Sequence, residues 1–279
     1  MQSRELVTAG RTKGPESFRL GRARARTIIA GMDVSDDGLL GNRVRLLQPA
    51  RGYRVAVDAV LLGAAIPAGA DERVIDVGCG VGAAALCLLA RLESAGVTDL
   101  KVIGLELQPH LAELARRNAE RNGFNECLEI VTGDVAAPPQ GLGTFDHVMT
   151  NPPYLPAARA DPPPDRSKAL ATVESTADLA GWMTFCLKVL RPGGTLSLVH
   201  RADRQTEIVD LLRPHAADIA ILPLLPQEGA AAKRLLLRLR QGRGGEVRML
   251  PAMILHHTGG EYTPAADAVL RGAQHLEIG

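Results

Sequence analysis

Short apolar runs alternate with longer amphipathic or alanine-rich stretches through most of this 279-residue chain. Runs of four to seven mainly apolar residues are typical of strands buried on both faces, and a longer stretch with helical periodicity predicts a helix. The predicted strands cover 73–77, 101–105, 128–131, 144–150 and 195–199, and the predicted helices cover 59–65, 83–92, 109–123, 178–190 and 204–212. This alternation predicts an α/β protein with a doubly wound, mostly parallel sheet.

Two further strands, 219–222 and 234–239, lie close enough in sequence to pair as an antiparallel edge, which brings the sheet to seven strands. A lead-in over about 32–70 contains a predicted turn at Asp36–Gly38 and a short strand at 44–47, and a C-terminal extension covers about 245–279. We therefore predict a single domain over 32–279, preceded by an arm over 1–31.

The charge of the chain is unevenly distributed. Residues 1–31 carry seven basic and two acidic side chains, a net charge of +5, whereas the whole chain carries only +1. We predict that this arm is disordered; it could also grip phosphates, or translation could begin at Met32 instead. A second basic stretch, 233–248, fits either a charged sheet edge or a phosphate contact.

Composition argues against several functional classes. No apolar run is long enough to span a membrane, and no secretory signal begins the chain. The four cysteines lack the CxxC spacing of a zinc site, so we expect reduced thiols in a cytoplasmic protein that binds no metal.

Four chemically distinctive residues fall where predicted strands end: Gly78, Glu106, Asp134 and Asn151. In a doubly wound sheet, ligands bind at the carboxyl ends of the strands. The sequence therefore predicts one site that gathers these four residues.

The loop after the first predicted strand contains Gly78-x-Gly80-x-x-Ala83, which satisfies a loose dinucleotide fingerprint with Glu106 as the ribose ligand. Asp76, two residues before the first glycine, disfavours a nearby pyrophosphate but suits an ammonium group. Asp134 can then accept a hydrogen bond from an adenine amino group. These residues favour a nucleoside cofactor that carries an amino acid.

Asn151-Pro152-Pro153-Tyr154 ends the strand at 144–150. Neither proline has an N–H for a sheet, so the strand stops and Asn151 is held at its tip. The Asn151 carboxamide, the Pro152 carbonyl and the Tyr154 ring would together receive a planar amino group. The alternative is a proline-terminated turn whose tyrosine belongs to the core.

With these residues the chain resembles the class I S-adenosylmethionine-dependent methyltransferases of the Asn-Pro-Pro-Tyr type. It resembles most closely the tRNA1(Val) (adenine-37-N6)-methyltransferases. The ordered motifs of this class span roughly 40–240, and the lead-in at 48–54 and 58–62 and the tail at 260–263 are also similar to that family. The chain departs from the family at Ala171–Glu174, where members often carry Ala-Arg-His-Glu.

The resemblance implies a Rossmann-like fold, S-adenosylmethionine as cofactor and an RNA partner, most closely tRNA. It implies in-line methyl transfer to adenine N6, with Tyr154 stacking on the flipped base. The implied catalytic residues are Asn151, Pro152 and Tyr154. The implied cofactor residues are Asp76, Gly78, Gly80, Gly82, Glu106, Leu107, Asp134, Val135 and Asn151.

Other activities share parts of this pattern. The same tetrapeptide serves methylation of a glutamine amide in peptide release factors, and of amino groups in ribosomal RNA or DNA. A nicotinamide-dependent oxidoreductase would share the glycine loop, but Asp76 and the Asn-Pro-Pro-Tyr site argue against it. A non-catalytic RNA-binding relic need not retain both Glu106 and Asn151. The sequence does not determine the oligomeric state.

Overall fold

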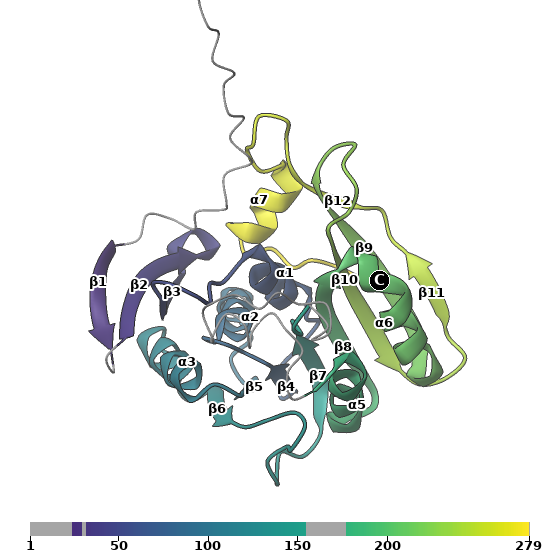
Figure 1. Ribbon diagram of the computed structural model, residues 1–279, viewed down its shortest axis with the longest axis horizontal. Coiled ribbons are helices and arrows are strands. Elements are labelled where there is room, and N and C mark those ends of the chain that lie inside the picture. The colour runs from purple at the N-terminus through teal and green to yellow at the C-terminus, as the bar shows by residue number, and fades with distance from the viewer. Residues whose placement is uncertain (1–23, 30–31, 155–176, 279) are drawn as a thin grey trace, which may run out of the picture.

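A nine-stranded sheet forms the centre of the computed structural model, which describes residues 24–29, 32–154 and 177–278, with backbone alone for 24–29 (Figure 1). Its strand order is β11-β9-β10-β8-β7-β4-β5-β6, with β12 also paired to β9. The parallel strands are β6 (Leu128–Thr132), β5 (Lys101–Glu106), β4 (Arg73–Val77), β7 (Phe145–Thr150) and β8 (Leu190–Arg201). The prediction of a mostly parallel α/β sheet is therefore confirmed.

The antiparallel strands are β10 (Arg234–Gln241) and β9 (Ala216–Gln227). β10 lies between β8 and β9, so the part of the basic stretch that forms β10 is inside the sheet, whereas its end at 246–248 lies in the outer strand β11. Leu235, Leu236 and Leu237 are all at most 1% exposed, because both faces of β10 are covered.

The predicted sheet lacked two strands, β11 (Glu246–Met249) and β12 (Met253–His256), which both pair with β9 in parallel. All four residues of β11 are exposed. Glu246–Met249 does alternate polar and apolar residues, but over only four positions, which is the shortest run that indicates a strand.

Helices cover both faces of the sheet. One face carries α1 (Val57–Ala65), α2 (Ala83–Ser94), α3 (Pro109–Arg121) and α7 (Pro264–Leu270), and the other carries α5 (Leu179–Val189) and α6 (Gln205–Leu212). Asp178 caps α5, since its Oδ1 accepts a hydrogen bond from Gly181 N at 2.8 Å. Two separate apolar cores on the two faces confirm the doubly wound arrangement.

A separate antiparallel sheet, β1 (Arg24–Ile29), β2 (Met32–Leu39) and β3 (Val44–Pro49), lies beside α3 (Figure 1). Part of the predicted arm thus forms β1, whereas residues 1–23 and 30–31 lie outside the described residues. The turn predicted at Asp36–Gly38 is wrong, because these residues continue β2. Asp37 is only 2% exposed there.

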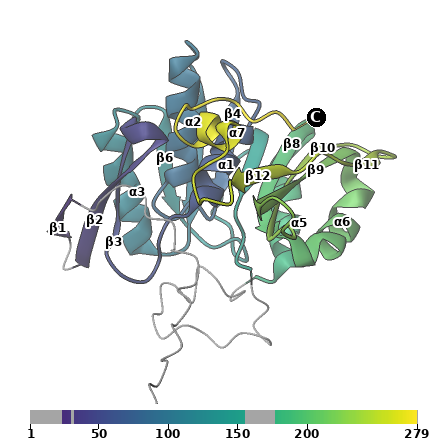
Figure 2. The same ribbon diagram turned by 90° about the horizontal axis from the view of Figure 1, so that it is seen from above.

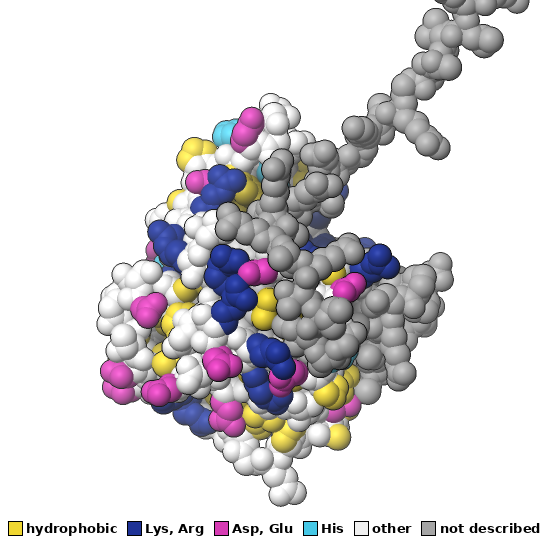
Figure 3. Space-filling view, turned by 90° about the vertical axis from the view of Figure 1, so that its left-hand side faces the viewer, with side chains coloured by type: hydrophobic (Ala, Val, Ile, Leu, Met, Phe, Trp, Pro, Cys, Tyr) yellow, Lys and Arg dark blue, Asp and Glu magenta, His cyan; other side chains and the backbone are white. Residues whose placement is uncertain are grey.

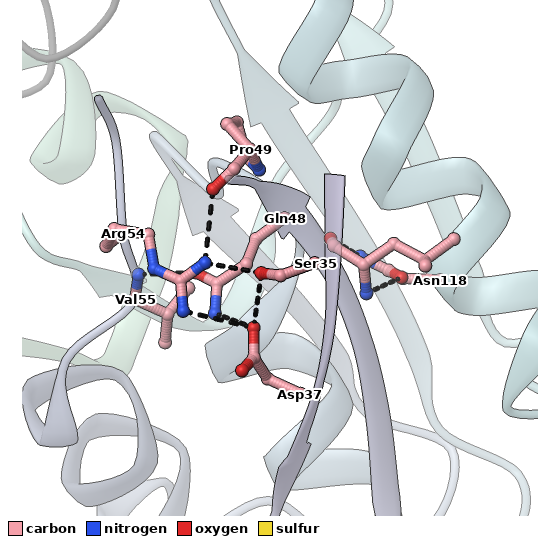
Figure 4. A network of polar contacts seen from close by, with 8 residues as sticks. Ser35, Asp37, Gln48, Pro49, Arg54, Val55 and Asn118 are labelled. Carbon is pink, nitrogen blue, oxygen red and sulfur yellow. Dashed lines mark hydrogen bonds and ion pairs between the residues drawn. The ribbon is translucent and has the colours of Figure 1, made fainter. Parts of the chain in front are cut away.

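Buried hydrogen bonds explain why β2 continues through Asp37 (Figure 4). Asp37 Oδ2 accepts hydrogen bonds from Ser35 Oγ at 2.6 Å, Gln48 Nε2 at 2.8 Å and Arg54 at 3.1 Å. Gln48 Oε1 in turn accepts a hydrogen bond from Val55 N at 2.8 Å. This network ties the segment after β3 to β2, and that segment leads into α1.

Two asparagines, one in α3 and one directly after it, bind the small sheet to the main body. Asn118 Oδ1 accepts from Leu47 N at 2.7 Å and its Nδ2 donates to Leu47 O at 2.9 Å, and Asn122 pairs in the same way with Arg45. Figure 3 shows this side of the molecule, where basic side chains lie close to acidic ones. Arg45 and Arg121 both pair with Asp36, so this face is not uniformly basic.

Within the C-terminal extension, α7 packs on α1 and on β12 (Figure 2). His275 Nδ1 and Leu276 N lie 2.8 and 2.9 Å from Ala64 O, at the last turn of α1. Arg43 also donates to Arg271 O at 2.7 Å, which links the extension to the segment before β3. The extension therefore holds the C-terminal end of α1 in place. None of the described helices combines the length and the apolar character needed to cross a membrane.

Candidate active site

A cavity of about 380 Å³ opens at the carboxyl ends of β4, β5 and β7. Nine of the eleven predicted site residues line it, namely Asp76, Gly78, Gly80, Glu106, Leu107, Asp134, Val135, Asn151 and Tyr154. Gly82 and Pro152 are absent from the lining, where Pro153 stands instead of Pro152. The strand ends thus converge on one cavity, because parallel neighbouring strands share an edge.

The glycine loop turns sharply between β4 and α2. Gly78 N and Cys79 N both donate to Leu105 O, at 2.8 and 3.0 Å. Gly78, Gly80 and Gly82 have φ angles of 75°, 57° and 83°, which residues with a Cβ rarely adopt. Gly82 has a local structural role, since it precedes the first residue of α2 and turns the chain into that helix.

Two aromatic side chains cover the glycine loop, and neither was assigned a site role from the sequence. A Cβ on Gly78 would lie 2.9 Å from the Trp182 ring, and a Cβ on Gly80 would collide with the Tyr53 hydroxyl. Trp182 Nε1 donates to Thr150 Oγ1 at 2.9 Å, which fixes the indole beside the cavity. Trp182 is the one tryptophan in the chain, and Tyr53 lies within the lead-in that resembles the family. Each of these features was a weak indication of a role at the site.

Glu106 stabilises the loop as well as lining the cavity. Its Oε2 accepts a hydrogen bond from Gly80 N and its Oε1 accepts one from Gln108 N, both at 2.8 Å. Burial raises the pKa of Glu106, and the hydrogen bonds from backbone amides oppose that shift. Each carboxylate oxygen has a further lone pair, so Glu106 can still accept from a ligand hydroxyl.

Asp76 places a carboxylate in the buried part of the cavity. The residue is 2% exposed, and its Oδ2 has no hydrogen-bond partner among the described residues. Burial raises the pKa of Asp76 to about 7; the Ala85 amide opposes this shift and the charge of Glu106 adds to it. An unpaired buried carboxylate oxygen fits a cationic donor on a ligand, such as an ammonium group.

Asn151 also presents an unpaired acceptor. Its Oδ1 is buried and has no hydrogen-bond partner among the residues that the structure describes. Because buried amide oxygens are normally paired, this atom is suited to a donor that a ligand brings.

Tyr154 lines the cavity but is also held by its neighbours. Its hydroxyl lies 3.4 Å from Asp58 Oδ2, and the Arg234 guanidinium lies 4.8 Å from the centroid of its ring. The His200 ring meets it edge-on, with centroids 5.6 Å apart. Burial and the charge of Asp58 raise the pKa of Tyr154 to about 12, so the hydroxyl stays protonated at neutral pH.

The basic stretch 233–248 does not form one surface. Arg234 reaches the cavity end of the sheet, whereas Arg248 pairs with Asp218 at 3.1 Å on the outer strands β11 and β9. The departure from the family at Ala171–Glu174 lies outside the described residues. Across the described ranges, no three His, Cys, Asp or Glu side chains are grouped as a metal site requires.

Comparisons with known proteins agree with this geometry. A family model described as a methyltransferase domain matches residues 74–176. A tRNA1(Val) (adenine(37)-N6)-methyltransferase of Porphyromonas gingivalis is 31% identical over 78% of this chain and 77% of its own length. One of Aeromonas hydrophila, with the same name, is 28% identical over 75% of this chain and 85% of its own length.

Among solved structures, a predicted O-methyltransferase from Agrobacterium tumefaciens superposes with a TM-score of 0.64. It is 26% identical and covers 79% of this chain and 98% of its own. The family model and these relatives establish that the protein is a methyltransferase that uses S-adenosylmethionine. The chain belongs to the class I S-adenosylmethionine-dependent methyltransferases and, within them, to the family of the tRNA1(Val) (adenine(37)-N6)-methyltransferases.

Proposed function

We propose that this enzyme methylates N6 of an adenine in tRNA, of the position-37 type that its relatives' names describe. The observation that carries the proposal is the buried Oδ1 of Asn151, which has no hydrogen-bond partner in the described part of the chain and shares one cavity with the aromatic ring of Tyr154. An amide acceptor next to a stacking surface is what a planar base with an exocyclic amino group requires. An enzyme with this substrate would act in the cytoplasm, where tRNA is modified.

Adenine N6 is a weak nucleophile because its lone pair is delocalised into the ring. We infer that Asn151 Oδ1 and the Pro152 carbonyl accept the two amino protons, which would turn the lone pair of N6 towards the methyl group. The Tyr154 ring would stack on the base, an effect on the order of 1–3 kcal/mol. Rate acceleration would come from orientation and from fixed acceptors rather than from a strong base.

The cofactor roles proposed for the cavity residues follow their positions. S-adenosylmethionine, when bound, supplies a methyl group activated by a sulfonium. Glu106 would accept hydrogen bonds from the ribose hydroxyls and Asp134 from the adenine amino group, with Leu107 and Val135 flanking the adenine ring. Asp76 would pair with the ammonium of the methionine part, because its Oδ2 is buried without a partner among the described residues.

Replacing Glu106 with alanine should weaken cofactor binding by roughly tenfold or more, because hydrogen bonds to a charged acceptor contribute on the order of 1.5–3 kcal/mol. Calorimetry with S-adenosylhomocysteine measures this loss. Glu113→Ala is a matched control, since Glu113 is a half-exposed glutamate of α3 that pairs with Arg117. Wild-type affinity in Glu106→Ala, or tight binding of NAD to the unmodified protein, would contradict the assignment.

The proposed substrate is tested by comparing nucleoside digests of total tRNA and ribosomal RNA from cells with and without the protein. We expect N6-methyladenosine to disappear from the tRNA fraction and to return when the wild-type protein is restored. The Asn151→Ala protein serves as the control and should not restore it. Loss of the modification from ribosomal RNA alone, or loss of glutamine methylation in release factors with unchanged tRNA, would overturn the proposal.

A further inference from the structure

Three side chains from separate elements surround Tyr154. Asp58 comes from α1 and lies 3.4 Å from the hydroxyl, and Arg234 comes from β10 and lies over the ring, 4.8 Å from its centroid. His200 comes from β8, and its ring lies nearly perpendicular to the tyrosine ring with the centroids 5.6 Å apart. The Tyr154 ring therefore has little freedom to rotate, although the residue lies at the end of a proline-rich segment.

Asp58 and Arg234 also pair with each other. Arg234 Nε donates to Asp58 Oδ2 at 3.1 Å, and the side chain of Asp58 is only 9% exposed. A buried ion pair commonly adds little to the stability of the folded protein, because the cost of removing both charges from water cancels their Coulomb attraction. The same Asp58 oxygen that binds Arg234 faces the Tyr154 hydroxyl, so the pair is built around the tyrosine.

We propose that Arg234 and Asp58 are positioning residues that orient Tyr154 for the target base. This inference rests on the proposed function, because it takes the ligand of Tyr154 to be a planar base. The guanidinium covers one face of the ring, Asp58 contacts the hydroxyl, and the His200 ring packs nearly perpendicular to the tyrosine ring. The opposite face of the ring receives the base, so that guanidinium, tyrosine and base form a three-layered stack.

The geometry of the guanidinium is essential to this role. An arginine is planar, stacks on aromatic rings and can bind a carboxylate from its edge at the same time. A lysine at position 234 would keep the charge beside Asp58 but could not lie flat on the ring. Methyl transfer depends on placement to within about 1 Å, where an error can cost about a hundredfold in rate.

Arg234→Lys is therefore the informative substitution. We expect its melting temperature and its affinity for S-adenosylhomocysteine to match the wild type, because the ion pair is retained and Arg234 does not line the cavity. The single-turnover rate of methyl transfer to tRNA, with both substrates saturating, should fall by about tenfold. Arg248→Lys is the matched control, because Arg248 pairs with Asp218 at 3.1 Å on the outer strands; its rate should be unchanged.

A second set of variants separates an effect on methyl transfer from an effect on folding. Arg234→Met leaves Asp58 buried without a cation and should lower the melting temperature. Combining it with Asp58→Asn removes both charges and should restore the melting temperature while methyl transfer stays about tenfold low. A structural role alone would restore both quantities together.

Two results would overturn the inference: a wild-type single-turnover rate in Arg234→Lys, or recovery of the rate along with stability in the double variant. Failure of the proposed function looks different. In that case the wild-type protein itself would leave tRNA unmethylated, before any variant is compared.

Discussion

Asn151→Ala should reduce single-turnover methyl transfer by roughly a hundredfold or more while the protein stays folded. The reason is that Asn151 Oδ1 is a buried acceptor without a partner among the described residues, so its removal breaks no internal hydrogen bond of that atom. The substitution also removes the side-chain hydrogen bond between Asn151 and Tyr154, which lowers the pKa of the tyrosine. Loss of one preorganised polar partner raises the free energy of the transition state of methyl transfer and leaves the free energy of unfolding nearly unchanged. Melting temperature, affinity for S-adenosylhomocysteine and methyl-transfer rate should be measured on the same preparation.

Two controls sharpen this experiment. Asn125→Ala removes an exposed asparagine that follows α3 and should change none of the three quantities. Tyr154→Phe should retain much of the rate, because it loses the long 3.4 Å contact between the hydroxyl and Asp58 and the hydrogen bond with Asn151, while the ring remains for stacking and Arg234, still paired with Asp58, can cover it. A folded Asn151→Ala protein that transfers methyl groups at the wild-type rate would contradict the proposed mechanism. A rate loss that merely follows a lower melting temperature would support the proline-terminated-turn alternative.

Asp76→Asn should change stability and cofactor affinity in opposite directions. Burial raises the pKa of Asp76 in the folded protein to about 7, above the ordinary value of 3.8. The folded state therefore favours the protonated acid, and its stabilising contribution is present below pH 3.8 and is lost as the pH rises to about 7. At pH 8 the ionised carboxylate destabilises the protein, on the order of a few kcal/mol, and asparagine removes that cost.

The expected result is a higher melting temperature for Asp76→Asn at pH 8 and little difference from wild type at pH 4. Affinity for S-adenosylhomocysteine at pH 8 should fall by roughly tenfold or more, because a charged partner of the ammonium is lost. Thermal melts at both pH values and calorimetry at pH 8 measure these quantities. A lower melting temperature at pH 8 would show that the Asp76 carboxylate stabilises the empty protein, contrary to the burial argument.

Much of the central fold could be predicted because its signals are local. The runs at 73–77, 101–105 and 128–131 are mainly apolar, which predicts buried strands without reference to the rest of the chain. The bounds of β4, β5 and β6 agree with these runs to within one residue. Once the strands were predicted to be parallel, Asp76, Glu106, Asp134 and Asn151 had to meet at one edge of the sheet. The structure brings all four to one cavity.

Other features depended on contacts that no local pattern contains. Asp36–Gly38 has the composition of a turn, yet the buried hydrogen bonds of Asp37 keep it within β2. The exposed strand β11 joins the sheet through its pairing with β9, a segment distant from it in the sequence, with β10 between them.

The surroundings of the site were decided in the same way. Tyr53, which precedes α1, and Trp182, which belongs to α5, both lie against the glycine loop. Asp58 and Arg234 pair although 176 positions separate them in the sequence. The sequence by itself thus determined the strands, the cofactor class and the polar residues at the strand ends, since these follow from local periodicity and residue chemistry. Only the tertiary structure decided what covers the cavity and what holds Tyr154, because burial and pairing between distant segments arise when the chain packs.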